Sequence, residues 1–314
     1  GGATIVDSIT SSTRIAGVPS GPSWRLPSVP GRSKGIAGSP KLQTGGFKAT
    51  TFHLSRFAFH CRIIALMNLP RFYCREALAS GAHIDLPEPV ARHAVRVLRL
   101  PPGAAVVLFD GRGGEYEARI ERIERERVVA ALGAWCAAER ESPLAVTLIQ
   151  AVQAGEKMDF TIQKAVELGV SGIVPVDSRR SVIRLAGERA GRRVAHWQGV
   201  AAAACEQCGR NQVPQVAPLE KLETWLARPA PSGLRLMLAP EAELALVDLP
   251  PARQVQMLIG AEGGLDPQEV VAAQQVGFTP VRLGPRVLRT ETAALAALAA
   301  LQALWGDFGG VKDV

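Results

Sequence analysis

The sequence predicts an α/β protein in which a small domain of β-strands precedes a larger domain built on a parallel sheet. Residues 67–140 contain short apolar segments separated by turn residues, a pattern typical of strands. From residue 141 to residue 308, strand-like and helix-like segments alternate, which favours a parallel sheet covered by helices on both faces. The 314 residues suffice for two such domains, and the hydrophobic content of 47% is that of a globular protein.

Residues 1–66 differ in composition from the rest of the chain. The segment is rich in Gly, Ser, Pro and Arg and shows no apolar period over its first 50 residues, so we expect a disordered leader. It is either an Arg-rich, Ser-rich transit peptide or translated upstream sequence with the natural start at Met67. The lack of a clear amphipathic helix favours the second interpretation. A short tail, residues 309–314, is predicted at the other end.

The net charge of +7 invites a nucleic-acid partner, but its distribution weakens that argument. Residues 1–66 hold eight of the 36 basic residues and one of the 29 acidic residues, which leaves 28 of each for residues 67–314. An RNA-binding surface on the folded part therefore depends on how its charges are arranged.

The cysteines and the hydropathy favour a cytoplasmic protein that binds neither metal nor membrane. The chain has five cysteines, a small and odd number that does not suit a disulfide framework. Cys205 and Cys208 form one C-x-x-C pair, but a structural zinc site needs four ligands, so we interpret them as small residues one helical turn apart. No apolar run reaches the roughly 18 residues that a membrane span requires.

In the first domain, residues 89–100 predict a helix that carries Arg92, His93, Arg96 and Arg99. Residues 106–120 predict two strands around a glycine-rich turn at 110–114, and residues 127–135 predict a further strand. A small β-barrel-like domain fits these elements.

In the second domain, five strands and four helices are predicted after a linker at 138–143. The strands are 144–152, 171–176, 234–239, 255–260 and 280–284. The helices are 156–168, 188–208, one that starts at Pro267, and 293–305. Ligands of such sheets bind beyond the carboxyl ends of the strands, so the loops that follow the strands are the candidate site.

Residues 258–270 are the first candidate loop. An apolar strand leads into three glycines and then into a helix, for which Asp266 and Glu269 form a capping box. Glycines let the backbone approach a ligand closely, although an ordinary strand–helix turn is the alternative. The G-x-G-x-x-G and P-loop patterns are absent, which disfavours a nicotinamide dehydrogenase. The glycines are Gly260, Gly263 and Gly264.

Residues 281–295 are the second candidate, a basic loop between a buried strand and an Ala-rich helix. It contains Arg286 and Arg289, and Thr290 or Thr292 is placed to cap the helix. Solvated arginines with capping threonines are the alternative, but the loop holds more polar groups than capping requires.

Two further segments carry polar side chains. On the helix at 156–168, Lys157, Thr161 and Lys164 share a face suited to phosphate contact, or simply a solvated face. At 204–214, Glu206, Gln207 and Arg210 are polar candidates for a site.

The segments together resemble the RsmE family of bacterial 16S ribosomal RNA uracil-N3 methyltransferases, which belongs to the SPOUT superfamily. The likeness extends from about Arg71 to Asp307. One departure is Ala261, which stands where the family commonly has proline. The matching segments, in order, are RFY at 71–73, residues 93–116, EKMDFTIQKAVELGV at 156–170, SRRSV at 178–182, EQCGR at 206–210, IGAEGG at 259–264 and LGPRVLRTETAAL at 283–295.

The resemblance implies a PUA-like RNA-binding barrel followed by a SPOUT domain whose chain threads a trefoil knot. It also implies a homodimer with its active site near the subunit interface, S-adenosylmethionine as the methyl donor, and 16S ribosomal RNA or the small ribosomal subunit as the substrate. The knot loops that would hold the donor correspond to residues 238–241, 259–264 and 283–292.

The resemblance and the chemistry together assign roles to residues. Arg289 is the catalytic candidate that stabilises the uracil anion, and Glu291 would orient it or help to remove the N3 proton. The expected donor-binding residues are Leu238, Ala239, Ile259, Gly260, Glu262, Gly263, Gly264, Leu283, Gly284, Leu288, Arg289, Thr290 and Thr292. The expected RNA-binding residues are Arg71, His93, Arg96, Arg99, Gln163, Lys164, Arg179, Arg180, Glu206 and Arg210.

Two other functions stay open on the sequence alone. A SPOUT enzyme that methylates another RNA atom, such as a ribose 2′-hydroxyl, would share the donor site. A non-catalytic RNA-binding assembly factor would use the barrel and bind no donor.

Overall fold

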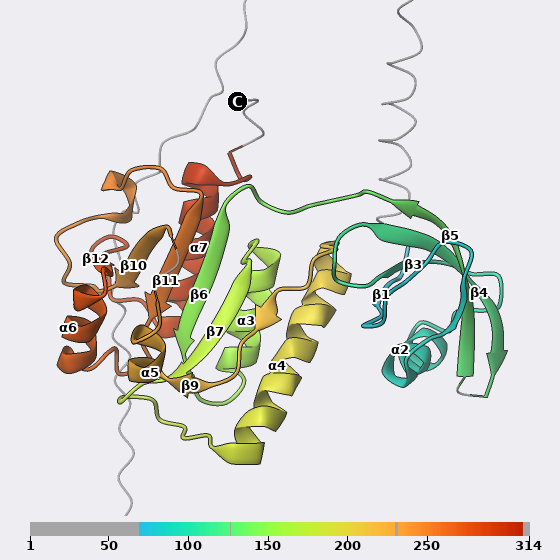
Figure 1. The fold of residues 1–314 in the computed structure, drawn as a ribbon, viewed down its shortest axis with the longest axis horizontal. Helices are drawn as coiled ribbons and strands as arrows, with labels where there is room; N and C mark the ends of the chain where they lie inside the picture. The colour runs from blue at the N-terminus through green and yellow to red at the C-terminus, as the bar shows by residue number, and fades with distance from the viewer. Residues whose placement is uncertain (1–68, 126, 230–231, 310–314) are drawn as a thin grey trace, which may run out of the picture. The chain divides into compact units, whose positions relative to one another are not determined.

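A computed structural model describes residues 69–125, 127–229 and 232–309 of the chain. The predicted leader, residues 1–66, lies outside the described residues, as does all but the first residue of the predicted tail. The described chain forms two sheets, one for each part of the sequence pattern (Figure 1).

The first sheet has five strands in the order β1-β3-β4-β5-β2. β1 pairs with β3 in parallel, and the other neighbours are antiparallel. The three strands predicted at 106–120 and 127–135 are confirmed, whereas β1 and β2, of three residues each, are too short to show a period. The strands are β1 (Arg71–Tyr73), β2 (His83–Asp85), β3 (Ala105–Phe109), β4 (Glu115–Glu124) and β5 (Arg127–Cys136).

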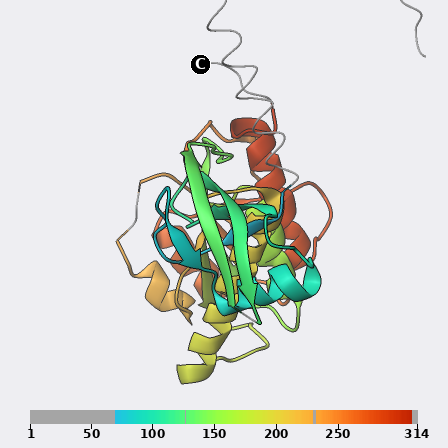
Figure 2. The same cartoon turned by 90° about the vertical axis from the view of Figure 1, so that its right-hand side faces the viewer.

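A helix lies beside this sheet, as predicted, but its second half is a π-helix (Figure 2). α2 (Glu88–Arg92) continues into η1 (His93–Val97), where the amide of Leu98 donates to the carbonyl of His93 at 3.0 Å. Arg99 follows with a φ of 53°, which is a left-handed backbone conformation that residues other than glycine rarely adopt. π-turns and left-handed residues of this kind are frequent at functional sites.

The second sheet has seven strands, all parallel where they pair. Six of them run in the order β12-β10-β11-β6-β7-β8, and β9 pairs with β7. All five predicted strands are confirmed, although β12 ends at Val281, three residues before its predicted end. The strands are β6 (Ala145–Ala151), β7 (Gly172–Asp177), β8 (Gln215–Val216), β9 (Glu220–Lys221), β10 (Leu234–Leu238), β11 (Gln254–Ile259) and β12 (Thr279–Val281).

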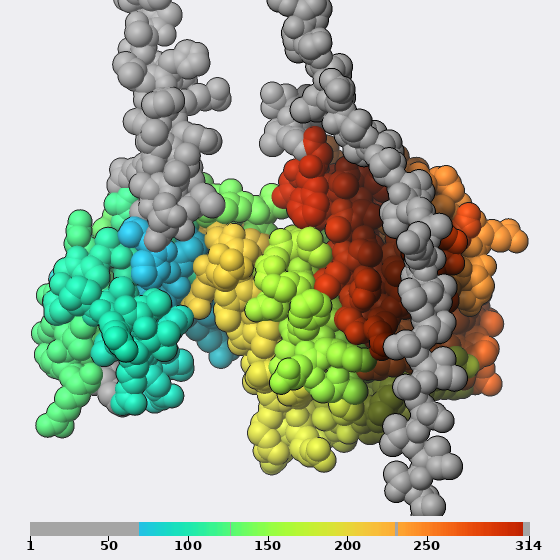
Figure 3. Space-filling view, turned by 180° about the vertical axis from the view of Figure 1, so that it is seen from behind, coloured from blue at the N-terminus to red at the C-terminus, as the bar shows by residue number. Residues whose placement is uncertain are grey.

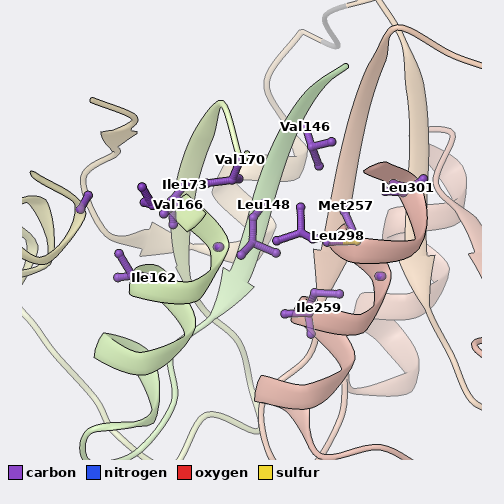
Figure 4. Close-up of a cluster of buried hydrophobic side chains, with 14 of the residues drawn as sticks. Val146, Leu148, Ile162, Val166, Val170, Ile173, Met257, Ile259, Leu298 and Leu301 are labelled. Carbon is purple, nitrogen blue, oxygen red and sulfur yellow. The ribbon is translucent and has the colours of Figure 1, made fainter. Parts of the chain in front are cut away.

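Helices cover both faces of this sheet because alternate strand residues are apolar on both sides. Leu148 and Met257 pack toward Leu298 and other buried side chains of one helical layer (Figure 4). Their neighbours in sequence, such as Ile149 and Leu258, pack on the opposite face. The first layer contains α3 (Lys157–Glu167), α4 (Gly187–Cys208) and α7 (Thr290–Trp305), and the second contains α5 (Leu222–Leu226) and α6 (Pro267–Gln275).

The helix boundaries agree with the sequence pattern except at α7. Asp266 caps α6 by accepting from the amide of Gln268 at 3.0 Å, and Glu269 completes the predicted capping box. α7 begins at Thr290, three residues earlier than predicted, and neither threonine of its first turn caps it. A short 3₁₀ segment, η2 (Leu246–Asp248), was not predicted. Among the described helices, none has the length and hydropathy needed to cross a membrane.

Candidate donor and RNA site

The main candidate site is a cavity at the carboxyl ends of three neighbouring strands. β12, β10 and β11 are adjacent in the sheet, and the chain leaves them at Val281, Leu238 and Ile259. The loops that follow line a cavity of about 210 Å³. Because parallel strands end at the same edge, three segments far apart in sequence meet there, as the sequence predicts.

Most of the expected donor-binding residues line this cavity together with both catalytic candidates. Gly263, Gly284 and Thr292 do not line it: the carbonyl of Gly263 accepts from Arg180 Nη1 at 3.0 Å, and the other two are exposed. Expected residues that line the cavity are Leu238, Ala239, Ile259, Gly260, Glu262, Gly264, Leu283, Leu288, Arg289, Thr290 and Glu291. Lining residues outside that expected set are Lys157, Pro240, Ala261, Leu265, Val281, Arg282, Arg286, Val287 and Ala293.

Gly260 is required by the way the glycine loop folds back on itself. A Cβ atom added at Gly260 would lie 2.7 Å from the carbonyl carbon of Gly264 and 2.9 Å from the amide nitrogen of Leu265. The amide of Gly264 donates to the carbonyl of Ala261 at 2.8 Å and closes the turn, with Gly264 at φ of 73°. The turn therefore forms with alanine at position 261.

Thr290 lines the cavity and connects the two candidate loops through a hydrogen bond. Its hydroxyl donates to the carbonyl of Gly260 at 2.6 Å and accepts from the amide groups of Gln150 and Gln153 at 3.2 and 3.3 Å. Gln153 in turn accepts from Thr161 at 2.9 Å. Thr161 is fully buried, so its expected place on a phosphate-facing surface is wrong.

Glu262 fastens the glycine loop to the segment that follows β6. Its Oε1 accepts from the amide of Ala154 at 3.0 Å and lies 3.5 Å from Lys157 Nζ. Burial raises the pKa of this carboxyl, but the backbone amides and the Lys157 ammonium lower the pKa by more, so it lies below its ordinary value. Glu262 is therefore an anionic anchor at neutral pH.

Arg289 and Glu291 sit on the cavity wall at the start of α7. Arg289 is the N-cap residue and its side chain is exposed, so its guanidinium is accessible to a bound molecule. Glu291 is half-buried, and its Oε2 is shielded from solvent without a hydrogen-bond partner among the described residues. A shielded carboxylate oxygen of this kind favours a ligand that carries a positive charge.

Seven of the expected RNA-binding residues lie at least partly on the surface. His93, Arg96 and Arg99 follow the π-turn of the first domain and are exposed. Lys164 already pairs with Glu167 at 2.7 Å, and Arg179 Nη2 pairs with Glu223 at 2.6 Å. Gln163 and Arg180 are also exposed.

The other three expected RNA-binding residues form hydrogen bonds within the protein, which argues against a role for them in RNA binding. Arg71 is 8% exposed and donates to Glu115 at 2.6 Å and to Asn211 at 2.5 Å. Arg210 is 4% exposed and donates to Glu141 and to the carbonyls of Val166 and Val170.

Glu206 is the third of these residues. Its Oε1 accepts from the amide of Tyr73 at 2.8 Å, and burial raises the pKa of the carboxyl despite that hydrogen bond. All three side chains join β1 or the linker to the end of α4. Residue type alone does not distinguish charged groups that are engaged within the protein from those that are available at its surface.

The C-x-x-C pair consists of a buried and a half-buried residue of α4, both with free thiols. Burial raises the pKa of the Cys205 thiol to about 12, and this thiol donates to the carbonyl of Gln212. A thiol that stays protonated at neutral pH is a poor metal ligand and a poor nucleophile. Within the described ranges, no three His, Cys, Asp or Glu side chains are grouped as a metal would need.

Comparison with known proteins assigns both parts of the fold to one class. A family model described as an RNA methyltransferase domain matches residues 140–302, and one described as an RNA methyltransferase PUA domain matches residues 86–132. The class is therefore an RNA methyltransferase with an amino-terminal PUA domain.

Individual relatives narrow the class to a family. The ribosomal RNA small subunit methyltransferase E of Buchnera aphidicola (subspecies Schizaphis graminum) is 32% identical over 76% of this chain and 98% of its own length. That of Bacillus subtilis is 30% identical over 67% of this chain and 85% of its own. The chain belongs to the ribosomal RNA small subunit methyltransferase E family.

Two solved structures share the fold over the full length of their chains. The Neisseria gonorrhoeae methyltransferase E bound to S-adenosylmethionine is 42% identical, covers 77% of this chain and superposes with a TM-score of 0.72. A Legionella pneumophila methyltransferase in complex with the same cofactor is 36% identical, also covers 77% of this chain and has a TM-score of 0.74.

Proposed function

We propose that the protein transfers a methyl group from S-adenosylmethionine to N3 of a uridine in small-subunit (16S) ribosomal RNA, in the cytoplasm. The observation that carries the proposal is the cavity in which the loops after β10, β11 and β12 converge, with Arg289 and Glu291 on its wall. Family membership and the SAM-bound structures of relatives support the same activity.

The residues of the cavity fit the proposed donor. Leu238, Ile259 and Leu288 supply apolar walls for a flat ring, and the glycine loop supplies backbone amides and carbonyls. The shielded Oε2 of Glu291 suits the positive charge that the donor carries. When bound, S-adenosylmethionine supplies an electrophilic methyl group, so the task left to the protein is mainly positioning.

Arg289 would act on the uracil. The N3 proton must leave before or during attack, and negative charge then develops on the base oxygens. A guanidinium at the cavity rim stabilises that charge, and a fixed hydrogen-bond donor of this kind contributes about 10²- to 10³-fold in rate. Glu291, two residues on in the first turn of α7, would orient Arg289 or help to remove the proton.

The RNA would lie over the exposed basic residues on both parts of the fold. His93, Arg96 and Arg99 extend from the PUA domain, and Gln163, Lys164, Arg179 and Arg180 extend from the methyltransferase domain. Phosphate contacts of this kind position the RNA but do not read its sequence. Arg71, Glu206 and Arg210 are left out because their polar groups are engaged within the protein.

We further propose a homodimer in which α3 and α7 face the partner subunit. The two helices pack side by side (Figure 3) and run in the same direction, since Thr290 lies near Thr161 and Gln302 donates to the carbonyl of Leu168. α7 is apolar on almost every side, and Phe160 and Leu304 are 48% and 43% exposed. Helices that are apolar all round are usually buried, so a second subunit is a suitable cover.

The test is mass spectrometry of small-subunit ribosomal RNA after incubation with the protein and the donor. We expect N3-methyluridine from the wild-type protein and a rate about 100- to 1,000-fold lower for Arg289→Ala. Arg253→Ala is the matched control, since Arg253 is an exposed arginine at the amino-terminal edge of the same sheet.

Three results would contradict the proposal. A 2′-O-methylated product would move the activity to another RNA atom. Failure of the wild-type protein to bind the donor in calorimetry would favour a non-catalytic assembly factor. Wild-type turnover by a folded Arg289→Ala variant would remove Arg289 from the mechanism.

A further inference from the structure

A second hollow, of about 530 Å³, lies beside the donor cavity and has a basic wall. It is bounded by the first half of α4, by Ile183 and Leu185 before that helix, and by residues 152–155 after β6. Nothing in the sequence pattern predicted it, because its basic residues belong to a helix that we expected only as an element of the fold.

The basic wall is one face of α4. Arg189, Arg192, Arg193 and His196 follow one another at spacings of three, one and three residues, which places them on the same side of a helix. No carboxylate of the described residues lines the hollow. Its floor includes the buried ring of Trp197 together with Val152.

Two of the four basic groups are held in place and two are available to a ligand. His196 contacts Asp159 at 2.7 Å, and Arg193 lies 3.5 Å from the same carboxylate and over the Trp197 ring. Arg189 is exposed, and Arg192 pairs with the exposed Glu188 at 3.2 Å. An exposed pair of this kind is weak and exchanges readily for a phosphate.

The hollow and the donor cavity lie on either side of one short segment. Gln153 and Gly155 line the hollow, and Lys157 lines the donor cavity. Gln153 also donates to Thr290, which belongs to the donor cavity, at 3.3 Å. The hollow and the donor cavity therefore share the segment 153–157 and are connected through Gln153 and Thr290.

We propose that this hollow binds a phosphodiester of the substrate RNA next to the target nucleotide, through Arg189 and Arg192. Two guanidiniums beside an apolar surface suit a nucleotide, since they contact the phosphate while the half-buried side chains of Ile183 and Leu185 accept the sugar or base. The inference rests on the proposed RNA substrate, but it assigns RNA contacts to residues outside the set expected from the sequence.

The test uses the full chain with Arg189→Glu and Arg192→Glu combined, and Arg253→Glu as the matched control. We expect the variant to bind small-subunit ribosomal RNA at least tenfold more weakly in a filter-binding assay without donor. The slope of log K against log salt concentration should fall by about one to two units, because two phosphate contacts are lost. Donor affinity by calorimetry and the melting temperature should stay as in the wild type, since neither arginine lines the donor cavity.

Each outcome distinguishes this inference from the proposed function. RNA binding and a salt slope equal to those of the wild type would overturn the inference, even if methyl transfer is confirmed. A shift from dimer to monomer in size-exclusion chromatography would also overturn it and assign the hollow to a subunit contact. If charge reversal unfolds the protein, Arg189→Gln with Arg192→Gln gives the same comparison. Absence of methyl transfer by the wild type would count against the proposed function alone.

Discussion

Gly260 is the residue at which the donor loop depends most directly on the lack of a side chain. Alanine at this position would place its Cβ 2.7 Å from backbone atoms of Gly264, which cannot move without opening the turn. We expect Gly260→Ala to lower the free energy of unfolding by about 1–3 kcal/mol, the usual cost of overpacking. Donor affinity in calorimetry should fall at least tenfold, because the turn lines the cavity.

Gly199→Ala is the matched control for this prediction. Gly199 lies within α4, and a Cβ there would meet nothing within 4 Å. Alanine is favoured over glycine in a helix by about 0.5–1 kcal/mol, so this variant should be slightly more stable and bind the donor normally. Equal donor affinity in Gly260→Ala and Gly199→Ala would show that the glycine turn does not shape the donor site.

At the residue scale, residues that shape the backbone could be predicted from the sequence, whereas the partners of buried polar side chains could not. The glycines and the capping box at 266–269 follow from local conformational rules, and the structure bears out the box. The role of Thr290 depends on Gly260 and Gln153, which are 30 and 137 residues away. From the sequence, Arg71 and Arg210 are reasonable RNA-binding candidates. In the folded protein their guanidiniums instead bind a carboxylate and backbone carbonyls that are distant in sequence.

At the scale of elements, the period of apolar residues predicted every strand of five or more residues in both sheets. It missed four of the five strands of two or three residues, β1, β2, β8 and β9, because so few residues do not establish an alternation. It also could not predict the π-turn at 93–97, because a π-turn differs from an α-helix by one hydrogen-bond register.

Thr290 is where four elements of the methyltransferase domain are joined. Its hydroxyl at the start of α7 binds the carbonyl after β11, and Gln150 and Gln153 connect it to β6 and, through Thr161, to α3. Thr290→Val keeps the volume but leaves the Gly260 carbonyl and the Gln153 amide without this partner. We expect the free energy of unfolding to fall by about 1–3 kcal/mol in a urea titration, the cost of buried groups left unpaired.

Thr290→Ser provides the comparison, because serine keeps the hydroxyl and removes only a methyl group. It should retain most of the stability and most of the donor affinity. Equal stability of the valine and serine variants would mean that the hydroxyl network does not join these elements.

At the scale of the whole molecule, the alternation of strands and helices predicts a parallel sheet but not the order of its strands. The order β12-β10-β11-β6-β7 brings the loops after β10, β11 and β12 to one edge, and no local pattern encodes it. The donor site was therefore predicted from motifs and resemblance, and the structure adds the cavity that they share. The trefoil knot implied by the resemblance stays a prediction.

Arg71 lies where the first sheet meets the segment that follows α4, and it takes part in a buried ion pair within that sheet. Arg71 of β1 pairs with Glu115, whose side chain is 0% exposed, and also donates to Asn211 after α4. Arg71→Ala would leave Glu115 with Arg140 alone, at 3.4 Å, and Asn211 Oδ1 without this donor. Removing one partner of a buried pair costs about 3–5 kcal/mol, because the remaining charge stays shielded from water.

We therefore expect Arg71→Ala to lower the free energy of unfolding by about 3–5 kcal/mol in denaturant titrations. Arg127→Ala is the control, since Arg127 forms an exposed pair with Asp85 in the same sheet, and removal of an exposed pair has little effect. RNA binding by folded Arg71→Ala should match that of the wild type at low temperature, because the guanidinium faces Glu115 and Asn211 and not the solvent. If the variant instead binds RNA more weakly and its stability is unchanged, then Arg71 contacts RNA and its buried ion pair does not stabilise the fold.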